Sequence, residues 1–226
     1  MCSKQNSSHN HRNKRKTTSL CPLCRAEAVL FYSSKKRSFY RCTECRGIFC
    51  GREFLPDNDE EYKRYCYHNN DVLDPHYQSF VSPITNSIVA DFSSDHTGLD
   101  FGAGPGPVIT KILKDQGYCV EAYDPYFSNY PRMLQTKYDY IACCEVIEHF
   151  YNPEKDFTLL KNLLKPQSKL YCMTELYTDD VDFKNWHYIT DTTHVFFYCK
   201  ETIALIKEKF EFSDVRIQER LIVFSI

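Results

Sequence analysis

The chain has 226 residues, of which 42% are hydrophobic and 26% charged, and its formal net charge is -2. These values suit one medium-sized globular domain with a core and a smaller appendage. No apolar run approaches the roughly 18 to 20 residues of a membrane span, and the polar start has no apolar signal region. Most of the twelve cysteines lie in tight pairs or in apolar runs, so a reducing cytoplasm fits better than secretion.

Charge is unevenly distributed along the chain. Residues 1–52 carry 12 Lys and Arg against two acidic residues, whereas the remainder carries 16 against 28. Such asymmetry is a hint of an anionic partner, nucleic acid or a phosphorylated substrate, and a solvated tail is the alternative. Residues 1–19 lack apolar periodicity and are expected to form a disordered basic tail.

Residues 20–52 contain two Cys-x-x-Cys pairs separated by 17 residues, within two predicted β-hairpins. Four thiolates at these separations can close a tetrahedron around one zinc ion, and about 30 residues are too few to fold on an apolar core alone. A redox Cys-x-x-Cys is the rival, but one pair would suffice for it and no strand-helix context follows. The segment is therefore predicted to be a zinc ribbon, with the ligands Cys21, Cys24, Cys42 and Cys45.

The rest of the chain predicts an α/β fold. Residues 53–95 are expected to form a helical linker or cap, broken at Pro75 and Pro83, that bridges the ribbon and the domain at 96–226. In that domain strands and helices alternate, which means a parallel sheet flanked by helices. We expect strands at 97–101, 118–123, 138–144, 168–175 and two near 214–225, and helices at 107–116, 145–165 (with a break) and 200–210.

A glycine turn follows the first of these strands and opens a helix. Gly102, Gly104 and Gly106 let a ligand approach the backbone where any side chain would clash. A dinucleotide site needs its third glycine at the place of Pro107, and the lysine of a phosphate-binding loop is absent, so pyrophosphate is disfavoured. Asp124 ends the next strand, where a carboxylate accepts hydrogen bonds from ribose hydroxyls. The pattern favours a nucleoside without phosphates.

Three motifs here resemble those of the class I S-adenosylmethionine-dependent methyltransferases: "LDFGAGPG", "YDPYF" and "YDYIACCEVIEHF". The resemblance covers roughly residues 60–226, and it is closest to a broad group that carries a four-cysteine ribbon in front of the methyltransferase domain. It implies a Rossmann-like sheet and S-adenosylmethionine as cofactor. By this resemblance the glycine loop lines the methionine and ribose part of the cofactor, Asp100 orients it, Asp124 binds the ribose and Glu145 borders the site of transfer; the loop residues are Gly102, Ala103, Gly104 and Gly106.

The stretch "EVIEH" places Glu145, Glu148 and His149 at i, i+3 and i+4, on one face of an expected helix. With His194 they resemble the divalent-metal site of two O-methyltransferase families, which act on the terminal ribose of small RNAs and in ubiquinone biosynthesis. That resemblance implies a magnesium or manganese site for the acceptor. The alternative is that Glu148 and His149 cap and pack the helix.

A second histidine-containing stretch, "WHYITDTTH", is expected to form a lid or loop over the acceptor pocket. Trp186, His187 and Tyr188 would stack on or hydrogen-bond a ring or sugar there. A lone histidine is more often structural, and this alternative is stronger for His68 than for His187. The candidate catalytic residues are thus Glu145, His149, His187 and His194.

The sequence therefore predicts a cytoplasmic methyltransferase. Because a sulfonium methyl is already activated, the protein mainly has to align an acceptor and remove its proton. A small metabolite or sugar-like molecule is the favoured acceptor, with the ribbon as a structural clamp. The alternatives are RNA docked by the basic ribbon and a non-catalytic module that has kept the fold; the intact glycine loop and Asp124 speak against the latter.

Overall fold

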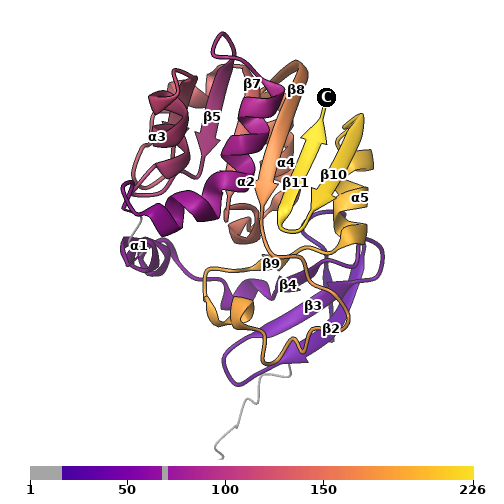
Figure 1. Ribbon diagram of the computed structural model, residues 1–226. Helices are drawn as coiled ribbons and strands as arrows, with labels where there is room; N and C mark the ends of the chain where they lie inside the picture. Colours follow the sequence, from indigo (N-terminus) through magenta and orange to yellow (C-terminus); the bar gives the residue numbers. More distant parts are fainter. Residues whose placement is uncertain (1–16, 68–70) are drawn as a thin grey trace, which may run out of the picture.

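The computed structural model describes residues 17–67 and 71–226. A large sheet with helices on both faces stands above a smaller sheet, which is built mainly from the N-terminal part of the chain (Figure 1). The predicted basic tail lies almost entirely outside the described residues, as does His68.

The large sheet contains six strands in the order β10-β11-β8-β7-β5-β6. The four strands β6, β5, β7 and β8 run parallel, and the β10-β11 hairpin adds antiparallel to β8. From β5 the chain continues to β6 on one side of it and then to β7 on the other side, so the order of the strands reverses at β5. Open α/β sheets bind ligands at such a point of reversal. The strands are Thr97–Phe101 (β5), Cys119–Tyr123 (β6), Tyr138–Cys144 (β7), Leu164–Met173 (β8), Asp214–Gln218 (β10) and Leu221–Ser225 (β11).

Alternate residues of the central strands face opposite sides of this sheet. Tyr140 and Ala142 of β7 pack with the helices α2 and α3, whereas Ile141 and Cys143 pack with α4 and α5. Both faces are thus buried, as expected for a parallel sheet. The helices are Asn58–Cys66 (α1), Pro75–Asp91 (α2), Val108–Asp115 (α3), Pro153–Asn162 (α4) and Lys200–Lys209 (α5), and short 3-10 turns occur at Arg52–Phe54 (η1), Pro131–Gln135 (η2), Ile147–His149 (η3) and His187–Thr190 (η4). The predicted α/β class is confirmed.

The smaller sheet has the order β1-β2-β3-β4-β9, and every pair in it is antiparallel. Three of its strands come from the predicted ribbon: Glu27–Ser33 (β2), Ser38–Cys42 (β3) and Ile48–Cys50 (β4). The strand Thr18–Leu20 (β1) begins in the predicted disordered tail, and that prediction is wrong for Thr18 and Ser19, which pair with β2. The fifth, Phe196–Phe197 (β9), comes from far along the chain and pairs with β4, as its colour shows in Figure 1. The ribbon sheet therefore includes a piece of the methyltransferase domain, which local sequence patterns did not predict.

The expected break at Pro83 is wrong. Pro83 lies inside α2, which runs without interruption from Pro75 to Asp91. A proline leaves the carbonyl four residues earlier without its helical donor. Here the hydroxyl of Ser82 donates to that carbonyl, of Ser79, at 2.7 Å, so the helix continues. Pro75, by contrast, stands at the first turn of α2 as expected.

None of the helices in the described ranges is long and apolar enough to cross a membrane.

Candidate functional site

A cavity of about 690 Å³ opens at the carboxyl ends of β5, β6 and β7. Its size is typical of sites for small molecules. The glycine loop and the end of β6 form one wall, the residues that follow β7 form another, and the helices α1 and α2 close it. Among the lining residues are Glu61, Arg64, Tyr65, Tyr77, Phe80, Gly102, Ala103, Gly104, Asp124, Tyr126, Glu145, Val146, His149, Asp191 and His194.

The glycine loop needs its glycines for backbone geometry. Gly102 and Gly104 have φ values of +77° and +66°, a region that side-chain-bearing residues rarely adopt. A Cβ atom on Gly102 would lie 2.5 Å from a methyl group of Val146. Asp100 is buried beneath the loop, where it accepts hydrogen bonds from the backbone N–H (3.1 Å) and hydroxyl (2.9 Å) of Thr110. Asp100 thus ties β5 to α3 and does not line the cavity; neither does Gly106.

Asp124 is fixed at the end of β6 by three backbone N–H groups. Its Oδ2 accepts from Gly104 at 2.9 Å, and its Oδ1 accepts from Tyr126 at 2.8 Å and from Phe127 at 3.1 Å. The residue is 7% exposed and lines the cavity. Because each carboxylate oxygen has two lone pairs, one acceptor position on Oδ2 remains available to a ligand.

Glu145 follows β7 directly and also lines the cavity. Arg220 contacts both of its carboxylate oxygens at 2.7 Å, and the hydroxyl oxygen of Tyr188 lies 3.2 Å from one of them. Burial raises the pKa of Glu145 to about 8, while Arg220 opposes that rise. The expected helix does not begin here: Glu145 has φ +52°, and only the 3-10 turn η3 follows before α4.

His149 and His194 also line the cavity and lie side by side, with ring centroids 4.9 Å apart. The Nδ1 of His149 is 2.9 Å from the carbonyl of Thr193, and that of His194 is 2.8 Å from the carbonyl of Tyr188. Since a carbonyl only accepts, both Nδ1 atoms carry the hydrogen and both Nε2 atoms are left as acceptors in the neutral rings. Burial lowers the pKa of both imidazoles, that of His194 to about 3.

The predicted metal cluster forms only in part. One ligand atom each from Glu148, His149 and His194 lie within 4.8 Å of one another, but Glu145 is not in this group. Glu148 is fully buried, and its carboxylate accepts hydrogen bonds from Tyr188 and from Thr174 (3.0 Å). Glu145 is engaged by Arg220 instead, and its φ of +52° departs from the helical geometry that the spacing assumes.

The stretch at residues 186–194 does not form the expected lid over the cavity. Trp186 and Tyr188 are buried in a cluster with ribbon residues such as Phe39, and neither lines the cavity. The side chain of His187 is 76% exposed and lies 3.3 Å from Glu175, and it does not line the cavity. The proposed catalytic contact of His187 is therefore not supported by its position. From this stretch only Asp191 and His194 reach the cavity.

Several residues that line the cavity were not predicted from the sequence. Arg64 of α1 pairs with Asp191 at 2.7 Å, so the cap helix is bonded to the loop that carries His194. Glu61, also on α1, accepts hydrogen bonds from Tyr65 (3.2 Å) and Tyr126 (2.8 Å). The capping box at Asp57 and Glu60 marks the start of this helix in the sequence, but nothing local indicates which of its faces meets the cavity.

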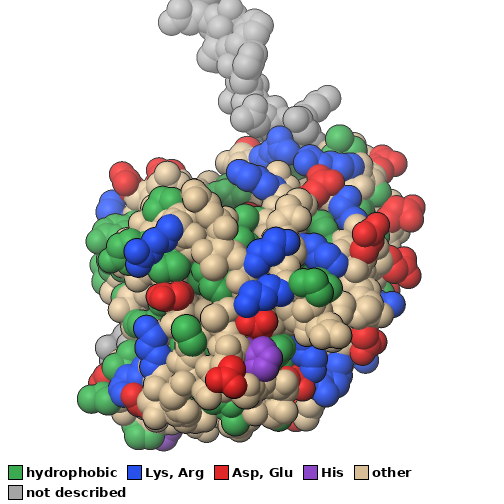
Figure 2. Space-filling model, turned by 90° about the horizontal axis from the view of Figure 1, so that it is seen from above, with side chains coloured by type: hydrophobic (Ala, Val, Ile, Leu, Met, Phe, Trp, Pro, Cys, Tyr) green, Lys and Arg blue, Asp and Glu red, His purple; other side chains and the backbone are tan. Residues whose placement is uncertain are grey.

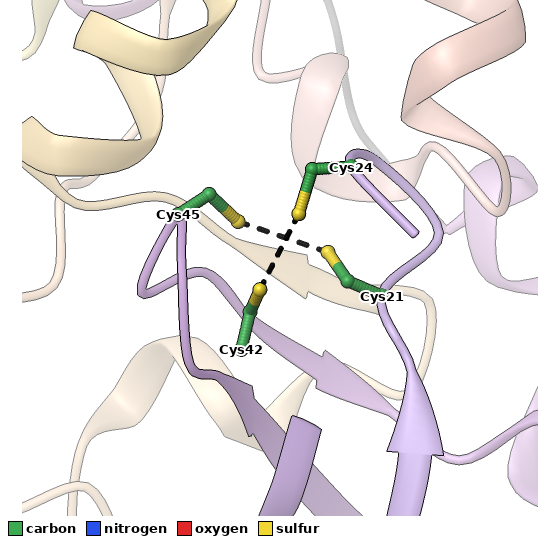
Figure 3. A group of neighbouring side chains, drawn as sticks. All are labelled: Cys21, Cys24, Cys42 and Cys45. Carbon is green, nitrogen blue, oxygen red and sulfur yellow. Dashed lines mark hydrogen bonds between the residues drawn. The ribbon is translucent and has the colours of Figure 1, made fainter. Parts of the chain in front are cut away.

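The four ribbon cysteines point toward one centre (Figure 3). The Sγ–Sγ distances are 3.7 Å for Cys21 and Cys45 and 3.4 Å for Cys24 and Cys42, and all four atoms lie within 4.8 Å of one another. Zinc–sulfur bonds of about 2.3 Å in a tetrahedron require sulfurs about 3.8 Å apart, so this donor set fits zinc.

The two cysteine pairs adopt the same turn. Arg25 and Arg46, the residues that follow the second cysteine of each pair, have φ values of +66° and +62°. In each pair the first cysteine donates its backbone N–H to a carbonyl five residues on, at Ala26 and Gly47, both at 2.9 Å. Two matching turns that present four thiols to one point are what a ribbon metal site requires.

Arginines of the ribbon contact the methyltransferase domain. Arg25 pairs with Glu154 and Arg41 pairs with Asp179, each at 2.7 Å. Some of the basic residues that make the N-terminal part positively charged thus form ion pairs within the same chain. On the face shown in Figure 2, Lys and Arg side chains are interspersed with acidic and uncharged ones.

Comparison with known proteins identifies the class. A family model described as a methyltransferase domain matches residues 73–217, more than half of the chain. The chain therefore belongs to this family of methyltransferase domains. A search of curated proteins finds no match to the sequence.

Solved methyltransferase structures share the fold. Phosphoethanolamine N-methyltransferase 2 of Haemonchus contortus is similar with a TM-score of 0.53 and 15% identity, over 72% of this chain and 44% of that one. An O-methyltransferase family protein of Burkholderia thailandensis gives 0.49 and 14%, over 73% and 61%. An S-adenosylmethionine-dependent methyltransferase of Archaeoglobus fulgidus gives 0.49 and 21%, over 62% and 71%. The chain thus spans less than two thirds of the first two proteins.

Proposed function

We propose that the protein transfers a methyl group from S-adenosylmethionine to an oxygen of a small metabolite or sugar-like molecule. The observation that carries this proposal is the cavity of about 690 Å³, which α1 and α2 line on one side. A site of this volume suits a nucleoside cofactor together with a small acceptor. Nitrogen or carbon acceptors of similar size would fit the same space.

The cofactor lies along the glycine loop in this proposal. Gly102 and Gly104 admit its methionine part, and the open acceptor position on Oδ2 of Asp124 takes a ribose hydroxyl. Asp100 serves indirectly, because it fixes the loop to α3 through Thr110. Glu145, held by Arg220, borders the sulfonium, whose positive charge a carboxylate stabilises.

The acceptor lies at the opposite end, against the unprotonated Nε2 atoms of His149 and His194. As the acceptor oxygen bonds to the methyl carbon, the carbon–sulfur bond breaks and its electron pair stays on sulfur, which becomes a neutral thioether. The acceptor proton passes to an imidazole Nε2 and then to solvent. Burial lowers the pKa of both imidazoles, so both rings are neutral before the transfer. His149 is the more exposed of the two and can pass the proton on to solvent.

Two metal sites complete the proposal. The four thiols of the ribbon would hold a structural zinc ion. Glu148, His149 and His194 would hold a divalent ion that polarises the acceptor when bound; the imidazole Nε2 atoms would then be ligands, and the acceptor proton would pass directly to solvent. A set of two imidazoles and one carboxylate suits manganese better than magnesium, which prefers oxygen ligands. The hydrogen bonds from Nδ1 to backbone carbonyls are the usual support of such histidine ligands.

RNA is the other candidate acceptor. Its support is the basic N-terminal part, but Arg25 and Arg41 are paired with acidic residues of the same chain. Incubation with methyl-labelled cofactor and fractionated cell extract separates the two. The proposal is supported if the wild type places label in the small-molecule fraction and His149→Gln does not. Label in RNA, or transfer by His149→Gln at the wild-type rate, would overturn it.

A further inference from the structure

The ribbon and the acceptor end of the cavity meet at one side chain. Arg37 lies in the turn between β2 and β3, and its guanidinium donates hydrogen bonds to four backbone carbonyls of a single loop, residues 189–194. The acceptors are the carbonyls of Ile189, Asp191 (3.2 Å), Thr192 (3.2 Å) and His194 (3.3 Å). The guanidinium also lies over the ring of Phe39, 5.0 Å from its centroid.

The hydrogen bonds from Arg37 are important because the 189–194 loop carries two residues that line the cavity. Asp191 and His194 line the cavity, and Asp191 is the partner of Arg64 on the cap helix. Backbone carbonyls in a partly buried loop need donors, and a guanidinium supplies several donors in one rigid plane. One arginine of the ribbon therefore satisfies the backbone at both ends of the segment that presents these two residues.

A second connection runs through the residue after His194. The backbone N–H of Cys50, at the end of β4, donates to the carbonyl of Val195 at 2.8 Å. The backbone N–H of Val195 in turn donates to the carbonyl of Glu148 at 2.9 Å. The chain of bonds thus continues from the ribbon sheet, through the loop, to the η3 turn that carries His149.

We propose that Arg37 is a positioning residue of the acceptor site: it holds the 189–194 loop so that Asp191 and His194 face the cavity, and the ribbon serves as the brace of this loop. The inference rests on the proposed placement of the acceptor beside His194. It assigns the ribbon a role inside the enzyme, in place of contact with another molecule.

The single tryptophan of the chain provides the probe. Trp186 is buried immediately before the loop, and its Nε1 donates to Glu175 at 2.8 Å. In Arg37→Ala, amide exchange of residues 189–195 should rise at least about tenfold, since more than one hydrogen bond is lost. Trp186 emission should shift to the red, and acrylamide should quench it more strongly. Arg37→Lys, which keeps the charge and some donors, should restore part of both signals.

Lys36→Ala is the matched control, because it removes a cation from the same turn as Arg37, at an exposed side chain away from the zinc ligands. Its loop exchange and fluorescence should match the wild type. Zinc content and cofactor affinity should stay at wild-type levels in all three variants. Unchanged exchange in Arg37→Ala, an equal rise in Lys36→Ala, or no recovery in Arg37→Lys would overturn the inference.

A global loss of zinc or of cofactor binding in Arg37→Ala would overturn it as well, because the effect would then not be confined to the loop. These measurements need no acceptor, so their outcome is independent of the proposed reaction. A wrong placement of the acceptor would appear separately, as wild-type methyl transfer by the His149 variant with the loop effect of Arg37 intact.

Discussion

Arg220 places one nitrogen, Nη2, 2.7 Å from both carboxylate oxygens of Glu145. The two residues lie 75 positions apart in the chain, one after β7 and the other in the β10-β11 turn. Glu145 also has a left-handed backbone conformation, with φ +52°. Arg220 therefore orients a partly buried carboxyl group at the cavity wall and opposes the rise in its pKa, at a residue whose backbone is strained.

Removal of Arg220 should destabilise the protein through Glu145. We expect Arg220→Met to lower the free energy of unfolding by about 2 kcal/mol, because it leaves a carboxylate without its charged donor. Glu145→Gln in the same chain should recover much of the loss, as a double-mutant cycle in urea would measure. Arg216→Met, on the exposed side of the same hairpin, is the control. A coupling energy near zero would contradict this relationship.

Asp100 should make stability depend on pH. Burial raises its pKa from 3.8 to about 6, so the folded state holds the proton more tightly than the unfolded state does. The stabilisation from Asp100 is then complete below about pH 4 and is lost as the pH rises through 6, by up to about 3 kcal/mol. Asp100→Asn cannot titrate there. The unfolding free energy of the wild type, relative to this variant, should fall between about pH 4 and 7; a flat or rising difference would refute the assignment.

The ribbon should contain one zinc ion per chain, held by the four thiols around the centre in Figure 3. Elemental analysis of purified protein should find it, and Cys42→Ser combined with Cys45→Ser should remove it. Cys66→Ser, at an exposed thiol outside the cluster, should leave it in place. Zinc-free wild type, or full zinc in the double variant, would refute the site.

Manganese should bind at the Glu148, His149 and His194 cluster. Electron paramagnetic resonance should show a bound population of Mn²⁺ that His149→Ala abolishes and that His76→Ala, at an exposed histidine, preserves. Affinity for the cofactor should not change when a chelator removes the ion, because the cluster lies at the acceptor end. If Mn²⁺ binds the wild type no better than His149→Ala, the imidazoles act without metal.

Local patterns in the sequence predicted much of the fold. The strand, glycine loop, helix and following strand that end at Asp124 are all present within a few residues of their expected bounds. Such elements are set by periodicity and turn residues that lie close together in the chain. The four ribbon cysteines were likewise found from spacing alone.

Contacts between distant segments escaped prediction. The pairing of β9 with β4, and the bonds from Arg37 to the 189–194 loop, join residues more than 140 positions apart. Pro83 was expected to break a helix. The hydroxyl of Ser82 donates to the carbonyl that the proline leaves without a donor, and the sequence pattern does not reveal this hydrogen bond. Glu145 was expected on the same helical face as Glu148, but its positive φ follows from packing at the end of β7 and from Arg220, neither of which the spacing of "EVIEH" encodes.

Calorimetric titration with S-adenosylhomocysteine, the product of the cofactor, tests the central claim most directly. The wild type should bind it with a micromolar-scale dissociation constant and should not bind NAD. Asp124→Asn should weaken binding at least about tenfold, since one charge-assisted hydrogen bond is worth more than about 1.4 kcal/mol. Asp115→Asn, at an exposed carboxylate on α3, should bind as the wild type does. Binding of NAD without S-adenosylhomocysteine, or undiminished affinity in Asp124→Asn, would contradict the cofactor site described for this methyltransferase.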